Sequence, residues 1–162
     1  MHEIMQWFRL LNSNKILPFN RWGVLFSHPA DFTPVCTTEL GVVAKLIPEF
    51  EKRNVKVIAL SCDPVDSHNG WIKDIQSYST LSGDFPYPII SDPNRDLAVQ
   101  LGMVDPVEKD KAGLPLTCRA VSAEPWHDIV HVYLWQEYCT LSISLAQLRR
   151  LLSPILQVMK SR

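Results

Sequence analysis

Hydrophobic residues follow two spacings along the chain, and segments of the two kinds alternate. Four short apolar runs rich in branched residues are typical of buried strands. They are residues 22–28, 55–61, 87–91 and 115–121. Segments that separate these runs carry apolar residues at the three- and four-residue steps of helices. They lie within residues 37–53, 63–79 and 92–103. Strands that alternate with helices predict an α/β fold with a largely parallel sheet and right-handed crossovers.

The first helical segment follows the first strand after a short loop. Thr37 or Thr38 is expected to cap it, with Glu39 in the first turn, where the helix dipole favours a carboxylate. Pro48 is expected to bend or break this helix near its end, because proline lacks the backbone N–H that a helix uses.

The chain after Val121 has a less regular pattern. Residues 129–135 could form a strand that pairs back as a hairpin, and residues 141–159 have the spacing of an amphipathic helix. We favour packing of this helix on the core, and a partner-binding seam stays open as the alternative. Pro154 disfavours a continuous coiled-coil seam.

Composition and charge narrow the classes of function. The chain has 162 residues, 46% of them hydrophobic and 20% charged, with a formal net charge of −1. This length predicts one compact domain, and the charge gives no basic surface for a nucleic acid. No apolar run reaches the length of a membrane span, and the N-terminal residues do not resemble a signal peptide. We therefore expect a cytoplasmic protein with no transmembrane segment and no nucleic-acid partner.

Cys36 occupies a position that can make a thiol reactive. It lies between an apolar strand and a helix, where unpaired backbone N–H groups and the helix dipole stabilise a negative sulfur. The thiolate is the nucleophilic form of cysteine. From position alone, however, a buried and unreactive cysteine is the favoured interpretation.

The residues around Cys36 match a longer pattern. Pro29, Thr33 and Cys36 form P-x-x-x-T-x-x-C within FSHPADFTPVCTTELG, which resembles the active-site loop of the peroxiredoxins. The similarity continues through IPEFEKRNVKVIALS, FPYPIISDPNRDLAVQLGM and DPVEKDKAGLPLTCRAV, and so covers roughly residues 22–121. Two threonines after the cysteine resemble the one-cysteine, peroxiredoxin-6 type. The resemblance implies a thioredoxin-like fold, with a central mixed sheet flanked by helices.

The resemblance also implies a role for each matching residue. Cys36 is the thiolate that attacks a peroxide oxygen and becomes a sulfenic acid. Thr33 orients the peroxide and the sulfur, and Pro29 shields the site from water. Arg119 stabilises the thiolate and polarises the peroxide through its fixed guanidinium fork. His28 matches a family histidine beside the site, and both a structural and a catalytic role stay open for it.

The implied function is a thiol-dependent peroxidase for hydrogen peroxide and organic hydroperoxides. The sulfenic acid is resolved by an external thiol, such as glutathione or a glutathione-transferring protein, and no bound cofactor or metal is expected. A homodimer is left open. The alternative is a catalytically impaired variant that serves as an interaction or dimerisation partner of a full-length peroxiredoxin.

Both ends of the chain depart from the family pattern. We therefore divide it into an atypical N-terminal segment (1–21), a peroxiredoxin core (22–121) and an atypical C-terminal segment (122–162). Members of this type are also credited with a phospholipase activity. Arg21 stands where its serine would be, and Lys15 stands near the place of its histidine. A cation cannot replace a nucleophile, so phospholipase activity is not expected.

The other cysteines have no predicted part in the reaction. Cys62 ends a strand, Cys118 is expected on the strand face opposite Arg119, and Cys139 lies outside the family-like span. His127 and His131 are four residues apart in a segment that has a strand pattern. Since that spacing suits a metal site only on a helix, no metal site is expected there.

Overall fold

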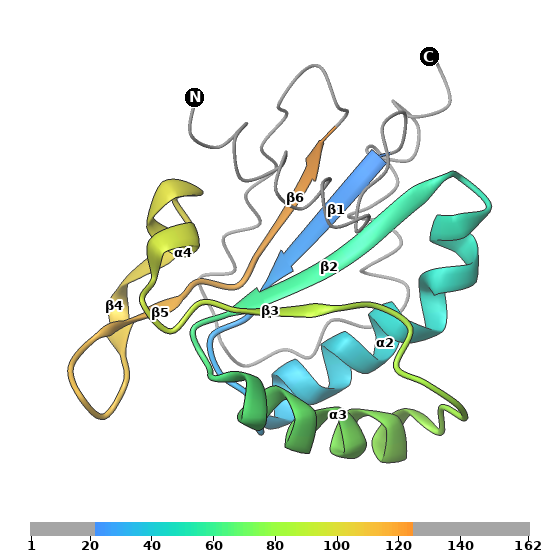
Figure 1. Ribbon diagram of the computed structural model, residues 1–162, viewed down its shortest axis with the longest axis horizontal. Coiled ribbons are helices and arrows are strands. Elements are labelled where there is room, and N and C mark those ends of the chain that lie inside the picture. The colour runs from blue at the N-terminus through green and yellow to red at the C-terminus, as the bar shows by residue number, and fades with distance from the viewer. Residues whose placement is uncertain (1–21, 125–162) are drawn as a thin grey trace.

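The computed structural model describes residues 22–124, which form a sheet with helices packed against it (Figure 1). The strands are β1 (Trp22–Ser27), β2 (Val55–Ser61), β3 (Ile89–Ser91), β4 (Val104–Lys109), β5 (Pro115–Thr117) and β6 (Ala120–Glu124). The helices are α2 (Pro34–Glu51), α3 (Val65–Ser79) and α4 (Asp96–Gln100). This order confirms the predicted alternation of strands and helices.

The central sheet is mixed, as the family resemblance implied. Its strand order is β3-β2-β1-β6, with β1, β2 and β3 parallel and β6 antiparallel to β1. Within this sheet Ser27 at the end of β1 lies opposite Leu60 of β2 and Ala120 of β6. The ends of β1 and β2 and the start of β6 therefore meet at one edge, where the chain turns into α2 and α3.

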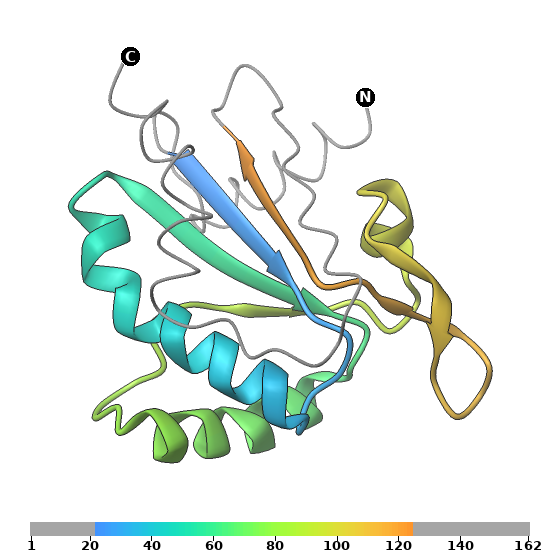
Figure 2. The same cartoon turned by 180° about the vertical axis from the view of Figure 1, so that it is seen from behind.

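Hydrophobic side chains pack on both faces of this sheet because neighbouring residues of a strand point to opposite sides. In β1, Val24 and Phe26 belong to the larger core cluster, while Leu25 packs against the smaller one. The larger cluster lies under α2 and α3, which Figure 2 shows together on one side of the sheet. Met103 and Leu101 belong to the smaller cluster. This two-sided burial explains the continuous apolar runs in the sequence.

Two of the predicted helices pack closely at one small residue. A Cβ atom added to Gly41 of α2 would lie only 1.9 Å from Oγ of Ser79 at the end of α3. The absence of a side chain at Gly41 therefore lets the two helices approach each other.

The start of α2 differs from the prediction. The helix begins at Pro34 with Thr33 as its N-cap residue, so neither Thr37 nor Thr38 caps it and no acidic residue lies in its first turn. Proline is favoured at this first helical position because its missing N–H would be unpaired there anyway. Pro48 lies inside the helix, which continues to Glu51.

The predicted strand at residues 115–121 is two strands, β5 and β6, separated by Cys118 and Arg119. β5 pairs with β4, a strand that the sequence pattern does not predict, in a separate antiparallel sheet. The pattern misses β4 because its side chains are largely exposed and carry no apolar alternation. The predicted strand at 87–91 is confirmed only as the shorter β3.

Several predictions lie outside the described residues. They concern residues 1–21, the strand at 129–135, the helix at 141–159, His127, His131 and Cys139. Within residues 22–124, none of the helices combines the length and the apolar character that crossing a membrane would require.

Candidate active site

Cys36 lies in the first turn of α2, two residues after the helix begins at Pro34. Its side chain is buried, with 1% of the residue exposed. The first N–H groups of a helix have no partner within the helix and carry a partial positive charge. The loop between β1 and α2 places the sulfur at the edge where the parallel strands end, which is where α/β folds commonly hold their sites.

Arg119 contacts the Cys36 sulfur. Its Nη2 lies 3.6 Å from Sγ, although the two residues are 83 positions apart.

The break between β5 and β6 is held by three hydrogen bonds. Cys118 N–H donates to the Met103 carbonyl over 2.7 Å, Ser27 Oγ–H donates to the Cys118 carbonyl, and Thr117 Oγ1–H donates to the His28 carbonyl. These hydrogen bonds therefore fix the backbone position from which the Arg119 guanidinium reaches the Cys36 sulfur.

Glu39 is a site residue that the sequence pattern assigns to a different role. Its carboxylate forms an ion pair with Nη1 of Arg119, and both side chains are largely buried. Glu39 lies one helical turn after Cys36, so the two side chains share a face of α2. The three-residue spacing from Cys36 is the sequence feature that indicates a shared position. The sequence pattern instead predicts that Glu39 interacts with the helix dipole. The carboxylate holds one arm of the guanidinium while another arm faces the sulfur.

Thr33 and Pro29 lie in the loop that precedes α2, and both are half-buried. The Thr33 hydroxyl donates a hydrogen bond to the Ala30 carbonyl over 2.9 Å, so only its oxygen lone pairs are left to accept. Phe32 between them has a φ of +55°, a left-handed conformation that is costly for a bulky residue. The loop therefore has a constrained backbone immediately before the helix that carries Cys36.

His28 is the first residue after β1 and is 1% exposed. Its Nε2 lies 2.9 Å from Oδ1 of Asp31, and the other oxygen of Asp31 lies 2.7 Å from Nδ1 of His68. Ser67 Oγ–H donates to the same Oδ2 over 2.7 Å. The Asp31 carboxylate thus links the loop before α2 to the start of α3. Sequence spacing gives no signal for this link, because 37 positions separate Asp31 from His68.

The pKa values of Asp31 and His28 are both lowered, which favours the charged form of the carboxyl and the neutral form of the imidazole. Burial alone would raise the pKa of the Asp31 carboxyl, but hydrogen bonds from His28, His68 and Ser67 outweigh it and hold that pKa well below its ordinary value. Burial lowers the pKa of the His28 imidazole more than the Asp31 carboxylate raises it. Near neutral pH the carboxylate is therefore ionised and His28 is neutral.

Trp71 of α3 connects His28 to the helix that carries Cys36. The centroids of the His28 and Trp71 rings are 4.9 Å apart, and Trp71 Nε1–H donates to Thr37 Oγ1 over 2.9 Å. Thr37 directly follows Cys36 and also donates its own hydroxyl proton to the Thr33 carbonyl. His28 is therefore joined to the first turn of α2 through one indole ring.

His28, Asp31 and Asp63 offer three possible ligand atoms within 4.8 Å of one another. Each is already engaged in hydrogen bonds, since Asp63 Oδ2 accepts from the Asp31 backbone N–H and from Ser61 Oγ–H. The distance of 2.9 Å between His28 Nε2 and Asp31 Oδ1 is that of a direct hydrogen bond. We therefore describe the group as a hydrogen-bonded network and assign no ion to it.

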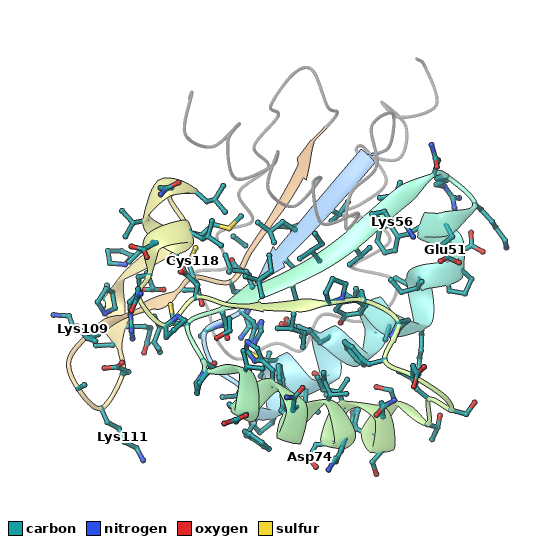
Figure 3. The ribbon with its side chains drawn as sticks, in the orientation of Figure 1. Glu51, Lys56, Asp74, Lys109, Lys111 and Cys118 are labelled. Atoms are coloured by element: carbon teal, nitrogen blue, oxygen red, sulfur yellow. The ribbon has the colours of Figure 1, made fainter. Side chains whose placement is uncertain are left out.

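Cys62 and Cys118 are buried free thiols. Burial raises the pKa of both, which disfavours their reactive thiolate forms. Cys118 belongs to the smaller hydrophobic cluster with Met103. Figure 3 labels Cys118 in the part of the molecule that holds α4. Its predicted place on the face opposite Arg119 assumes one continuous strand, whereas the structure has a break at these two residues.

Comparison with known proteins gives the class to which this fold and site belong. The AhpC/TSA family profile matches residues 11–121, which is more than half of the chain. The chain therefore belongs to the AhpC/TSA family. The thioredoxin-like α/β fold implied by the sequence is confirmed by this match and by the solved structures that resemble the chain.

Several of the similar proteins are peroxiredoxin-6 proteins. Peroxiredoxin-6 of Bos taurus is 64% identical over 102 residues, which are 62% of this chain and 46% of that protein. The human protein is 62% identical over the same length. A cysteine-to-serine mutant of the Peroxiredoxin 6 of Arenicola marina is 49% identical, with a TM-score of 0.75, and the match covers 88% of this chain and 61% of that one.

A yeast mitochondrial one-cysteine peroxiredoxin is also similar, with 38% identity and a TM-score of 0.73 over 88% of this chain and 67% of that one. The resemblance to peroxiredoxin-6 is thereby confirmed. This chain spans about half the length of the curated relatives that it matches.

Proposed function

We propose that the protein is a thiol-dependent peroxidase that reduces hydrogen peroxide and organic hydroperoxides through a sulfenic acid on Cys36. The observation that carries the proposal is the contact between the Arg119 guanidinium and the Cys36 sulfur at the start of α2. Similarity to peroxiredoxin-6 over the residues that hold this contact supports it.

In the proposed step the Cys36 thiolate attacks one peroxide oxygen. An S–O bond forms as the O–O bond breaks, the sulfur is oxidised to a sulfenic acid, and the departing oxygen takes up the proton that the thiol gave away. The product is water or an alcohol. Arg119 stabilises the thiolate and then the charge that develops on the peroxide oxygens, while Glu39 keeps the guanidinium in place.

The remaining site residues have supporting roles in this proposal. Thr33 accepts a hydrogen bond from the peroxide through its oxygen, because its own proton is used by Ala30. Pro29 limits access of water from the loop side. His28 is buried against Trp71 beside the site, and both a structural and a catalytic role stay open for it.

An external thiol completes the cycle. Cys62 and Cys118 are buried and have raised pKa values, which supports resolution from outside the described residues. In the similar yeast one-cysteine peroxiredoxin, the thiol is resolved through glutathione and thioredoxin systems. We propose glutathione, or a protein that transfers it, as the reductant here, with no prosthetic cofactor.

Residues 22–121 form the peroxidase core in this proposal, flanked by the atypical segments 1–21 and 122–162. We propose that the protein acts in the cytoplasm and without phospholipase activity, because Arg21 replaces the serine that such a reaction would use. Homodimerisation stays open.

The test is peroxide consumption by the purified chain with dithiothreitol as reductant. Cys36→Ser should lose essentially all activity, because a hydroxyl stays protonated near neutral pH and cannot act as the nucleophile. The triple variant Cys62→Ser, Cys118→Ser, Cys139→Ser is the matched control and should still turn over.

Retention of more than a few per cent of the rate in Cys36→Ser would contradict the proposal. A wild-type chain that has folded, by circular dichroism, yet consumes no peroxide would favour the alternative of an impaired dimerisation partner. Co-elution with a full-length peroxiredoxin would then be the measurement to make.

A further inference from the structure

One buried carboxylate attaches the loop between β1 and α2 to the start of α3. Asp31 Oδ1 lies 2.9 Å from Nε2 of His28. Asp31 Oδ2 lies 2.7 Å from Nδ1 of His68 and accepts a hydrogen bond from Ser67 Oγ–H. Only 1% of the Asp31 side chain is exposed. We call these four residues the latch, because His28 and Asp31 come from the loop and the other two come from α3.

The latch holds a loop whose backbone is strained. Phe32, next to Asp31, has a φ of +55°, which is costly for a bulky residue. Its side chain is 57% exposed and meets α3 at Gly70, where an added Cβ atom would lie 3.3 Å from Phe32 Cζ. Because so much of this ring stays in water, its burial stabilises the closed loop little. The attachment of the loop to α3 therefore depends mainly on the buried hydrogen bonds of the latch.

The closed loop has no place for a second proton on His28. An ionised carboxylate can only accept hydrogen bonds, so the Nε2 that faces Asp31 must be an N–H. A further proton can enter the ring only at Nδ1. Within residues 22–124, this nitrogen is buried and has no hydrogen-bond partner. An imidazolium in the closed loop would therefore bury an N–H with no acceptor, which is unfavourable.

Titratable groups face the His28 ring from its own loop, from the end of β2 and from α3. They are Asp31, Asp63 and His68. The ring of Trp71 packs against His28, and the Thr117 hydroxyl of β5 donates to its carbonyl, but neither carries a charge. The two carboxylates favour an imidazolium at His28 and the second imidazole opposes it.

Burial outweighs these charges and lowers the pKa of His28 in the closed loop. Although burial acts in the other direction on Asp31, hydrogen bonds from His28, His68 and Ser67 hold the pKa of that carboxyl well below its ordinary value. The carboxylate therefore stays ionised while His28 titrates. Since an opened loop returns His28 to water and to its ordinary pKa, the opened form binds more protons, and closing becomes less favourable as the pH falls.

We propose that the latch is a proton-sensitive device, in which uptake of a proton by His28 releases the loop before α2 from α3. The loop is closed at neutral pH and opens increasingly below about pH 6.5, the ordinary range of an imidazole. It leads directly into the first turn of α2, so its release loosens the segment that carries Thr33 and Cys36. This inference goes beyond the proposed peroxidase function and does not depend on it.

The test is amide hydrogen exchange of the ¹⁵N-labelled full chain at about pH 7.5 and about pH 5.5, with each rate divided by the intrinsic rate at that pH. The reporter is the Asp31 N–H, which donates to Asp63 Oδ2 over 2.9 Å in the closed loop. One proton taken up on opening raises the opening constant by up to about tenfold over this interval. We expect a rise of at least about threefold.

His28→Gln should remove the effect, because its amide can still donate to Asp31 but cannot gain a proton. Its opening constant should change by less than about twofold between the two pH values. The matched control replaces the histidines outside the latch, as His2→Gln, His127→Gln and His131→Gln together, and should keep the wild-type rise. The Ala59 N–H of β2, which donates to the Pro88 carbonyl over 3.0 Å, should show no rise, because the core stays folded.

The inference is overturned if the wild-type opening constant rises by less than about threefold, a result that needs no variant to fold. It is also overturned if His28→Gln keeps the rise, if the control variant loses it, or if the Ala59 N–H rises equally, since the whole core would then be opening. A wild type that shows the predicted rise but consumes no peroxide would contradict the proposed function and leave the latch supported.

Discussion

At the scale of single residues, Arg119 is shared between two partners. One arm of the guanidinium pairs with the Glu39 carboxylate and another faces the Cys36 sulfur at 3.6 Å. A planar fork can serve both at fixed geometry, whereas a lysine ammonium is a point charge on a flexible stem. The proposed reactivity of Cys36 would therefore depend on this particular cation as well as on the helix N-terminus.

Arg119→Lys should accordingly lower kcat/KM for peroxide reduction strongly despite the retained charge. Loss of one preorganised donor in an oxyanion-type site costs about 2.7–4 kcal/mol, or roughly 10²–10³ in rate. The matched control is Arg53→Lys, which alters an ion pair with Glu49 at the other end of α2. Exposed pairs of that kind contribute little, so its kcat/KM should be nearly unchanged. Near-normal kcat/KM in Arg119→Lys would show that the guanidinium does not act on the peroxide.

Single residues also show how far a sequence can predict a site. Cys36, Thr33 and Pro29 lie in one continuous motif, so the pattern indicates them together. Glu39 and Asp31 belong to the site because of distant partners. Glu39 pairs with Arg119, 80 positions away, and Asp31 contacts His68, 37 positions away. Such contacts depend on the sheet order and on how α3 packs on α2, and a local sequence pattern predicts neither of these.

At the scale of elements, a buried tyrosine ties the loop before β3 to α2. The Tyr87 hydroxyl donates to the Leu40 carbonyl over 2.8 Å, 47 positions away. Burial raises the pKa of Tyr87 well above its ordinary value, so the phenol stays a neutral donor. This bond helps to hold the middle of the helix whose first turn contains Cys36.

Tyr87→Phe should therefore lower the free energy of unfolding by about 1 kcal/mol, the usual net worth of one buried hydrogen bond. Urea denaturation followed by circular dichroism measures this directly. Tyr78→Phe is the matched control, because Tyr78 is 64% exposed on α3 and its change should stay within about 0.5 kcal/mol. Equal effects of the two substitutions would mean that the hydrogen bond contributes nothing.

The elements differ in how well their patterns predict them. β2 has the predicted bounds, since a strand buried along nearly its whole length has an unbroken apolar run. The start of α2 comes earlier than predicted, because the threonines that suggest a cap lie inside the helix and donate to carbonyls one turn earlier. β4 has no apolar signal at all, because it is exposed and pairs only with β5.

At the scale of the whole molecule, the candidate site belongs to the shared edge where β1, β2 and β6 meet α2 and α3. Family membership and the similarity to peroxiredoxin-6 agree with this arrangement, although the chain spans about half of those relatives. The described residues to which the proposal gives a role, from His28 to Arg119, lie within residues 22–121. We therefore propose Cys36 as the residue that reacts, with a thiol from outside the described residues to regenerate it.

The most direct measurement is mass spectrometry of the chain after treatment with one equivalent of hydrogen peroxide and no reductant. We predict oxidation confined to Cys36, as a sulfenic acid captured by a trapping reagent or as its over-oxidised forms. Cys62, Cys118 and Cys139 should stay reduced, and dithiothreitol added before trapping should restore the Cys36 thiol. A stoichiometric disulfide between Cys36 and any of the other three cysteines, or an unoxidised Cys36, would contradict the account.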